Sequence, residues 1–208
     1  MNMNQAGRAD GRTEDALTLD DVRRVRYDDP CAAAAIGAAV AEVLGRCYHP
    51  EREHLALVCI GTDRSTGDAL GPLVGRCVAA TQLRGLRVYG TLDAPVHASN
   101  LTSALEAVDG PACVVAVDAC LGRLETVGQI SVAPGPLLPG AGVNKQLPAV
   151  GRMHITGTVN VGGFMEYFVL QNTRLALVMR MAEVIAEGVA LAVGALPFTA
   201  QVATASGA

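Results

Sequence analysis

Residues 55–72 read LALVCIGTDRSTGDALGP, an apolar run followed by a glycine-bounded polar loop that holds Asp63 and Asp68. A second apolar run at residues 112–119, ACVVAVDA, also ends close to an acid, Asp118. Continuous apolar runs of this kind are typical of strands covered on both faces, as in parallel sheets. Because the carboxyl ends of parallel strands open onto one crevice, the sequence predicts Asp68 and Asp118 on a common rim.

Helical patterns alternate with strand patterns along the chain. We expect helices at residues 31–46, 69–82, 100–108, 164–170 and 173–191, and strands at residues 55–60, 86–91, 112–117, 127–132 and 153–158. This alternation predicts a three-layer α/β/α domain around a largely parallel, mixed central sheet. The domain is expected to span residues 29–208. Residues 1–28 are polar with little apolar periodicity and are expected to form a mobile tail.

Composition excludes several functional classes. The net charge is −4 and basic residues cluster only at positions 23, 24 and 26, so the electrostatic signature of a nucleic-acid binder is missing. No membrane span or secretory signal is recognisable, and a cytoplasmic protein is expected. The six cysteines form no CxxC pair, which indicates reduced thiols and no zinc site. The sequence does not decide between a monomer and a homo-oligomer.

Asp68 and Asp118 each have a structural and a chemical interpretation. Asp68 either caps the helix that follows it or accepts a proton from water, and the N-terminus of that helix would keep its carboxylate ionised for the second role. Asp63 is a second candidate in the same loop. Asp118 either bonds loop amides or forms a pair with Asp68. In a facing pair, mutual repulsion would keep one acid protonated and the other ionised, which suits hydrolysis of an amide by a bound water.

A glycine-rich loop at residues 139–145, PGAGVNK, holds Lys145, the only lysine among sixteen basic residues. A compact ammonium at this point, together with loop amides such as those of Gly140 and Gly142, would stabilise the oxyanion of a tetrahedral intermediate. The surrounding segment, residues 133–150, is too rich in proline and glycine for regular structure, and a long loop inside a compact domain is usually functional.

Two alternative chemistries remain open on the residues alone. His97 follows Asp93 by four positions, and with Asp68 or His154 these side chains would form a metal site, although the spacing lacks a tight ligand motif. Cys120 would be a nucleophile if His97 or His154 served it as a base. We expect no cofactor, with a divalent metal as the alternative.

Several segments resemble one known family. The segments CIGTDRSTGDALGPLVG, YGTLDAPVHASNL, VAVDACLG, PLLPGAGVNKQLPAVG and ITGTVNVGGFME resemble the sporulation protein family known as spore protease YyaC, with the similarity extending over residues 55–186. That family is similar to the germination protease of spore-forming bacteria and, more distantly, to the hydrogenase maturation proteases. The resemblance implies a phosphorylase/hydrolase-like fold of the maturation-protease type.

The resemblance also implies roles for individual residues. The germination protease has catalytic aspartates in D-A-L-G-P and I-D-A-L motifs, which match Asp68 and Asp118. Its P-G-S-G-V-G-N-K loop, one glycine longer, is similar to residues 139–145, and this places Asn144 and Lys145 in a shared motif. The chain resembles only the protease core, without the extra region and activation segment of the larger enzyme.

The function implied is an intracellular peptidase of sporulation or spore germination that acts on protein or peptide substrates such as small acid-soluble spore proteins. One alternative is a catalytically silent relative that uses the same crevice to bind a peptide or partner. Another is a metal-dependent processing protease like the hydrogenase maturation proteases, with Asp68, Asp93 and His154 as the candidate ligands.

Overall fold

The computed structural model describes residues 22–140 and 147–196, and the strands of these residues form one six-stranded sheet in the order β1-β5-β6-β4-β2-β3. Strands β2, β3, β4 and β6 run parallel, whereas β5 and β1 are antiparallel to their neighbours. The predicted largely parallel, mixed sheet is therefore confirmed. The strands are β1 (Arg23–Arg26), β2 (His54–Cys59), β3 (Leu86–Tyr89), β4 (Ala112–Gly122), β5 (Gln129–Pro134) and β6 (Met153–Val161).

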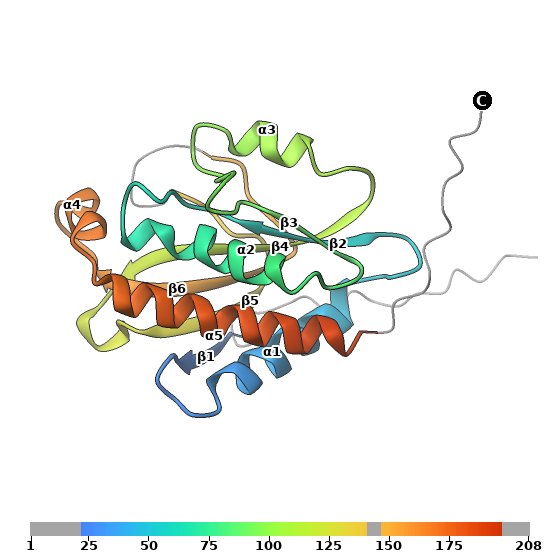
Figure 1. Ribbon diagram of the computed structural model, residues 1–208, viewed down its shortest axis with the longest axis horizontal. Helices are drawn as coiled ribbons and strands as arrows, with labels where there is room; N and C mark the ends of the chain where they lie inside the picture. Colours follow the sequence, from blue (N-terminus) through green and yellow to red (C-terminus); the bar gives the residue numbers. More distant parts are fainter. Residues whose placement is uncertain (1–21, 141–146, 197–208) are drawn as a thin grey trace, which may run out of the picture.

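Helices cover both faces of the sheet, as the α/β/α prediction requires (Figure 1). Three long helices lie on one face: α1 (Ala32–Cys47), α2 (Leu70–Ala80) and α5 (Leu175–Gly194). The short α3 (Leu101–Glu106) and the loops after β3 and β5 lie on the other. Helix α4 (Glu166–Gln171) follows β6, and two 3₁₀ turns, η2 (Gly67–Ala69) and η3 (Leu124–Thr126), follow β2 and β4.

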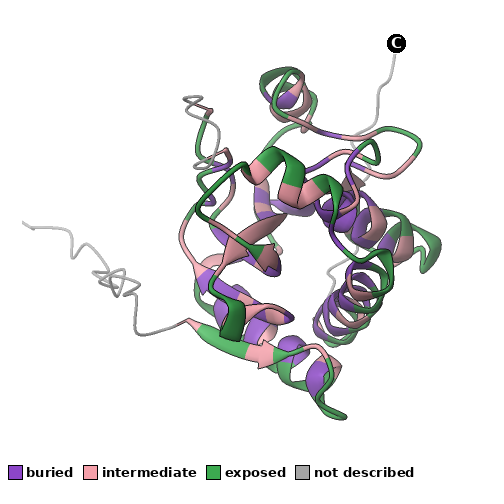
Figure 2. Ribbon diagram, turned by 90° about the vertical axis from the view of Figure 1, so that its left-hand side faces the viewer, coloured by how far each residue is buried: buried purple, intermediate pink, exposed green. Residues whose placement is uncertain are grey.

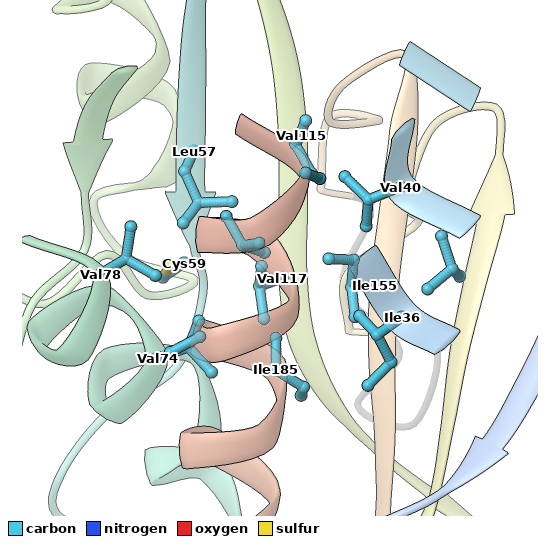
Figure 3. Packing of buried hydrophobic residues seen from close by; sticks show 14 of the residues in the cluster. Ile36, Val40, Leu57, Cys59, Val74, Val78, Val115, Val117, Ile155 and Ile185 are labelled. Atoms are coloured by element: carbon cyan, nitrogen blue, oxygen red, sulfur yellow. The ribbon is translucent and has the colours of Figure 1, made fainter. Parts of the chain in front are cut away.

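The main core lies between the sheet and α1, α2 and α5. Figure 3 shows Ile36 of α1 and Ile185 of α5 among the valines and isoleucines of β4 and β6. Aromatic residues make up only 3% of the chain, so small aliphatic side chains fill this layer and the helices approach closely. At the α1–α5 crossing, a Cβ on Gly188 would lie 2.6 Å from Cγ2 of Ile36, which explains the glycine there.

A smaller core lies under α3 on the opposite face of the sheet. Val58 of β2, Ala116 of β4 and Leu101 of α3 are buried in it, together with Leu137 and Val150. Leu137 and Val150 exchange two backbone hydrogen bonds of 2.8 Å, which close the base of the segment between β5 and β6. Asp118 follows Ala116 by two residues on β4, and successive side chains of a strand alternate between the two faces. Asp118 therefore lies on the same face as Ala116, the one covered by the smaller core.

Two sequence-based expectations about the strands were wrong. Residues 23–26 were predicted to lie in the mobile tail, but they form β1 and pair with β5, from Arg23 opposite Val132 to Arg26 opposite Gln129. Strand β4 was expected to end before Asp118, but it continues to Gly122 because β6 runs alongside it over the same length. The predicted tail at residues 1–21 lies outside the described residues.

No helix in the described ranges is both long and apolar enough to cross a lipid bilayer.

Candidate carboxylate site

Asp118 lies within β4, flanked on both sides by neighbouring strands. It is in register with Thr156 of β6, and Val117 before it accepts a 2.7 Å hydrogen bond from the amide of Ile60 at the end of β2. The side chain is half-buried, and its Oδ1 accepts a hydrogen bond of 2.8 Å from the amide of Ala119. One backbone amide is therefore the partner that the structure shows for this carboxyl group among the described residues.

Asp68 reaches the same rim from the loop that follows β2. The loop is fastened at both ends: the Gly61 amide donates to the Val96 carbonyl at 2.8 Å, and the Thr62 amide donates to the Asp68 carbonyl at 3.1 Å. Asp68 itself is half-buried in η2, and η2 packs against β4. Because η2 contacts β4, Asp68 lies near enough for its charge to act on Asp118.

Asp68 is not the cap of α2, which was the structural alternative. Ala69 occupies the N-cap position of that helix, and no side chain accepts a hydrogen bond there. The 3₁₀ turn inserts between the loop and the helix, so the carboxylate is displaced from the first turn of α2. The expectation that a helix terminus keeps Asp68 ionised is therefore wrong.

Burial and mutual repulsion set the protonation of the pair. Burial raises the pKa of Asp118 well above its ordinary value, the negative charge of Asp68 raises it further, and the Ala119 amide opposes both. Burial also raises the pKa of Asp68, but the Thr62 amide and the nearby His97 oppose that shift. Asp68 is therefore the acid that ionises first, and Asp118 is the one that retains its proton.

The other predicted acids and histidines lie apart from the pair, with one exception. Asp63 and Asp93 are exposed to solvent. His154 lies on β6 with its Nδ1 2.9 Å from the Gly135 carbonyl oxygen. His97 is the exception, because it lies near enough to Asp68 to oppose the rise in the pKa of that acid. Its Nδ1 accepts a 3.3 Å hydrogen bond from the Ser99 amide.

The predicted oxyanion residues fall mostly in the part of the chain that is not described. Gly142, Asn144 and Lys145 lie outside the described residues, so their predicted role stays a prediction. Gly140 is described and has a positive φ of 73°, a conformation that favours glycine.

Comparison with known proteins places the chain in a family. Residues 24–188 match the family model described as "Protein of unknown function (DUF1256)". The chain belongs to the DUF1256 family. It is 52% identical over 171 residues to the protein described as "Uncharacterized protein YyaC" of Bacillus subtilis (strain 168), a match that covers 80% of this chain and 82% of that one. Neither description states an activity, so the name spore protease is not confirmed.

A solved structure also resembles this DUF1256 chain. It is the crystal structure of a [NiFe] hydrogenase maturation protease, HycI, from Thermococcus kodakarensis KOD1. The TM-score is 0.48 and the sequence identity 18%, and the match covers 74% of this chain and 98% of that chain.

The side chains of this DUF1256 member do not fit the metal alternative. Within residues 22–140 and 147–196, no three His, Cys, Asp or Glu side chains are grouped so that they could hold a metal ion. Of the three proposed ligands, Asp93 is exposed, His154 contacts the Gly135 carbonyl, and Asp68 lies in the turn that packs on β4. The set Asp68, Asp93 and His154 is therefore not brought together.

The sequence did not predict a row of polar side chains beside Asp118. Cys120 follows Asp118 on the same face of β4, and its Sγ lies 3.5 Å from Oγ1 of Thr158 on β6. Burial raises the pKa of Cys120, and this outweighs the opposing hydrogen bond with Thr158, so Cys120 remains a neutral thiol, a poor nucleophile. The sequence does contain a signal for this row. Thr156 and Thr158 alternate along β6 as Asp118 and Cys120 do along β4, and the parallel register places each threonine opposite one of them.

We expect the Asp118→Asn variant to be more stable than the wild-type chain at neutral pH. Because the pKa of Asp118 is raised in the folded state, the stability contributed by Asp118 is fully present below the ordinary carboxyl pKa and is lost as the pH rises through the raised value. Each tenfold difference in proton affinity between the folded and unfolded chains corresponds to about 1.4 kcal/mol of this loss. Asparagine has no proton to lose, so the stability of the variant does not decrease in this way as the pH rises. Melting temperatures of both chains, measured from acidic to neutral pH, test the difference.

The matched control is Asp63→Asn, which makes the same change of charge at an exposed position. It should reproduce the pH dependence of the wild type. Identical pH dependence in the wild type and in Asp118→Asn would show that Asp118 ionises normally.

Proposed function

We propose that this protein is an intracellular peptidase of the germination-protease type, active in the cytoplasm during sporulation or in the germinating spore. The observation that carries the proposal is the charge of Asp68 acting on the half-buried Asp118 across the rim of the sheet. Two carboxyl groups held in different protonation states supply both a base and an acid at one place. The match of both acids to the D-A-L-G-P and I-D-A-L motifs of the germination protease supports the same assignment.

The chemistry follows from the two protonation states. Ionised Asp68 accepts a proton from a water molecule, whose oxygen then bonds to the carbonyl carbon of the scissile peptide. Protonated Asp118 donates its proton to the carbonyl oxygen, which gives a neutral tetrahedral intermediate. The carbon–nitrogen bond then breaks, the amine leaves with the proton held by Asp68, and a hydroxyl proton of the intermediate returns to Asp118. One water is consumed and the products are a carboxylic acid and an amine.

The substrate proposed is a protein, with small acid-soluble spore proteins as the candidates that the resemblance names. We propose that the two acids carry out the hydrolysis by themselves, without a metal ion. The loop with Asn144 and Lys145 is proposed to stabilise the negative charge that develops on the carbonyl oxygen.

The test is incubation of the purified full chain with purified small acid-soluble spore proteins, with the new chain ends identified by mass spectrometry. We expect a bell-shaped dependence of kcat/KM on pH. It rises as Asp68 loses its proton and falls as Asp118 loses its own, and both limbs lie above the ordinary carboxyl pKa of about 3.9 because both pKa values are raised. EDTA should leave the rate unchanged.

Three outcomes would contradict the proposal. Intact substrates after prolonged incubation at every pH would remove the peptidase assignment. A rate that does not fall at high pH would remove Asp118 as the acid. Loss of activity in EDTA, with recovery on addition of a divalent metal, would favour the metal-dependent alternative.

A further inference from the structure

An exposed aromatic surface lies at the end of β6, in a chain with few aromatic residues. Phe164, Met165, Tyr167 and Phe168, which we call the aromatic platform, are 81%, 51%, 62% and 53% exposed. The whole sequence has only three Phe, four Tyr and no Trp, so nearly half of its aromatic side chains lie on this one exposed segment. Helix α4 has no buried residue. It lies on the side of the molecule that faces the viewer in Figure 2. Clustered exposed apolar side chains commonly mark a binding surface.

The aromatic platform is held in place from below by a polar network. Nδ2 of Asn160, on β6, donates to the carbonyl oxygen of Val169 at 3.3 Å and to Oγ1 of Thr173 at 3.2 Å. Thr173 Oγ1 in turn donates to the Val169 carbonyl at 2.9 Å. Tyr167 and Phe168 also pack edge to face, with ring centroids 5.7 Å apart. The rings are therefore presented on a fixed support.

The backbone at the start of α4 is also held in a fixed, unusual conformation. Met165 has a φ of 51°, in the left-handed region that residues with side chains rarely adopt. Strain of this kind persists only where the surroundings enforce it. Here it turns the chain between Phe164 and Tyr167, so that rings from both sides of the turn reach solvent.

The aromatic platform is continuous with the carboxylate site. A Cβ on Gly67, the residue before Asp68, would lie 2.8 Å from Cδ2 of Leu170 and 2.9 Å from Oγ1 of Thr173, so η2 rests directly on α4. Thr156 lies opposite Asp118 on β6, and the same strand runs on to Val161, just before the aromatic platform.

The charge of the segment limits what can bind. Glu166 is the only ionisable acid or base with a formal charge between Val161 and Thr173, and its Oε1 accepts a 3.3 Å hydrogen bond from the Gly163 amide. The segment between Val161 and Thr173 therefore offers apolar area and no basic group of its own, and its single acid is turned to its own backbone. Uncharged apolar side chains match it best.

We propose that the aromatic platform binds apolar side chains of an extended polypeptide substrate, near the point where Asp68 and Asp118 cleave it. The proposal rests on the peptidase function above and adds the class of sequence that the enzyme selects. An extended chain crossing the carboxyl edge of β4 and β6 meets both surfaces, because η2 and α4 are in contact. Rigid aromatic side chains of this type often dominate binding energy in interfaces.

The experiment measures binding separately from cleavage. The Asp68→Asn chain is titrated, by fluorescence anisotropy, into a short uncharged fluorescein-labelled peptide with Leu-Phe-Leu at its centre, and into the same peptide with three serines there. The test variant adds Phe164→Ser, Tyr167→Ser and Phe168→Ser. The control variant instead adds Leu191→Ser, which removes a similarly exposed leucine, 51% accessible, from α5.

We expect the apolar peptide to bind at least about tenfold tighter than the serine peptide to the Asp68→Asn chain and to the Leu191→Ser control. The aromatic triple variant should lose this preference while its circular dichroism and melting temperature stay close to those of the parent, because the replaced rings are exposed. With both acids present, the triple variant should raise KM for a protein substrate and leave kcat nearly unchanged.

Equal binding of both peptides to the parent chain, or an undiminished preference in the triple variant, would overturn the proposal. So would a dimer of the parent chain in sedimentation that dissociates in the triple variant, because a second copy would then be the occupant. Failure of the proposed peptidase function is a different result: wild-type chain that cleaves no substrate while the binding preference persists.

Discussion

Replacement of either acid of the pair by asparagine is expected to lower kcat/KM for small acid-soluble spore proteins at least about 1,000-fold. With Asp68→Asn, the side chain could not accept the proton of the attacking water. With Asp118→Asn, the side chain at position 118 could not donate a carboxylic proton to the carbonyl oxygen of the scissile peptide. Each replacement keeps the size of the side chain, so the loss would come from the proton transfer and not from packing. Initial rates of cleavage, measured with the same substrate preparation, give the ratio.

Asp63→Asn is the control for this experiment. Asp63 lies in the same loop and carries the same charge, but it is exposed, and the neighbouring Arg64 donates to Thr62 Oγ1 at 3.3 Å. Its replacement should change the rate less than about threefold, a change of well under about 1 kcal/mol. Activity retained by the variants at positions 68 and 118 would show that the pair is not catalytic. Partner binding retained by both, without wild-type cleavage, would favour the silent alternative.

Gly71→Ala is expected to reduce the free energy of unfolding by about 3 kcal/mol. A Cβ on Gly71 would collide with the carbonyl oxygen of Ile60, a backbone atom that cannot rotate away. Either α2 or the end of β2 must move, and both flank the loop that holds Asp68. Chemical denaturation measures the loss, and cleavage should weaken with it.

Gly45→Ala is the matched control, because Gly45 is also helical but nothing lies within 4 Å of the position of its Cβ. Alanine there should raise the free energy of unfolding by about 0.5–1 kcal/mol through its better helix propensity. Equal stability of the two variants would mean that α2 does not pack on the end of β2 as described.

The parallel part of the sheet could be predicted because its strands are covered on both faces. The runs at residues 55–60 and 112–117 are apolar throughout, and every residue of β2 is buried. The lack of burial on both faces explains why β1 and the end of β4 were not predicted. Strand β1 contains three arginines and contributes mainly backbone hydrogen bonds at the edge, so it has no apolar pattern. The last residues of β4 face a partly open rim, and Asp118 interrupts the run before the strand ends.

The carboxylate site was predicted from topology and from the resemblance, but its electrostatics were not. The sequence has Asp68 directly before a helical pattern, which suggested a cap and an ionised carboxylate. The 3₁₀ turn at residues 67–69 depends on the contact of Gly67 with α4, which lies far along the chain, and no local pattern encodes it.

The exposure of α4 was equally hidden from the sequence. The helix itself was expected at residues 164–170, but a run such as FMEYFVL is usually a sign of burial. Its aromatic side chains reach solvent because Asn160 and Thr173 attach the helix to β6 through polar contacts and leave the rings uncovered.

Strand β1 also protects the sheet against self-association. Without it, β5 would offer an open row of amide and carbonyl groups on which a strand of another molecule could add. The four residues of β1 complete those hydrogen bonds and replace a longer, flatter margin with a short one that carries Arg23, Arg24 and Arg26. A short edge strand that carries charged side chains disfavours edge-to-edge pairing of two sheets, and so disfavours fibrous aggregation when many copies are crowded together.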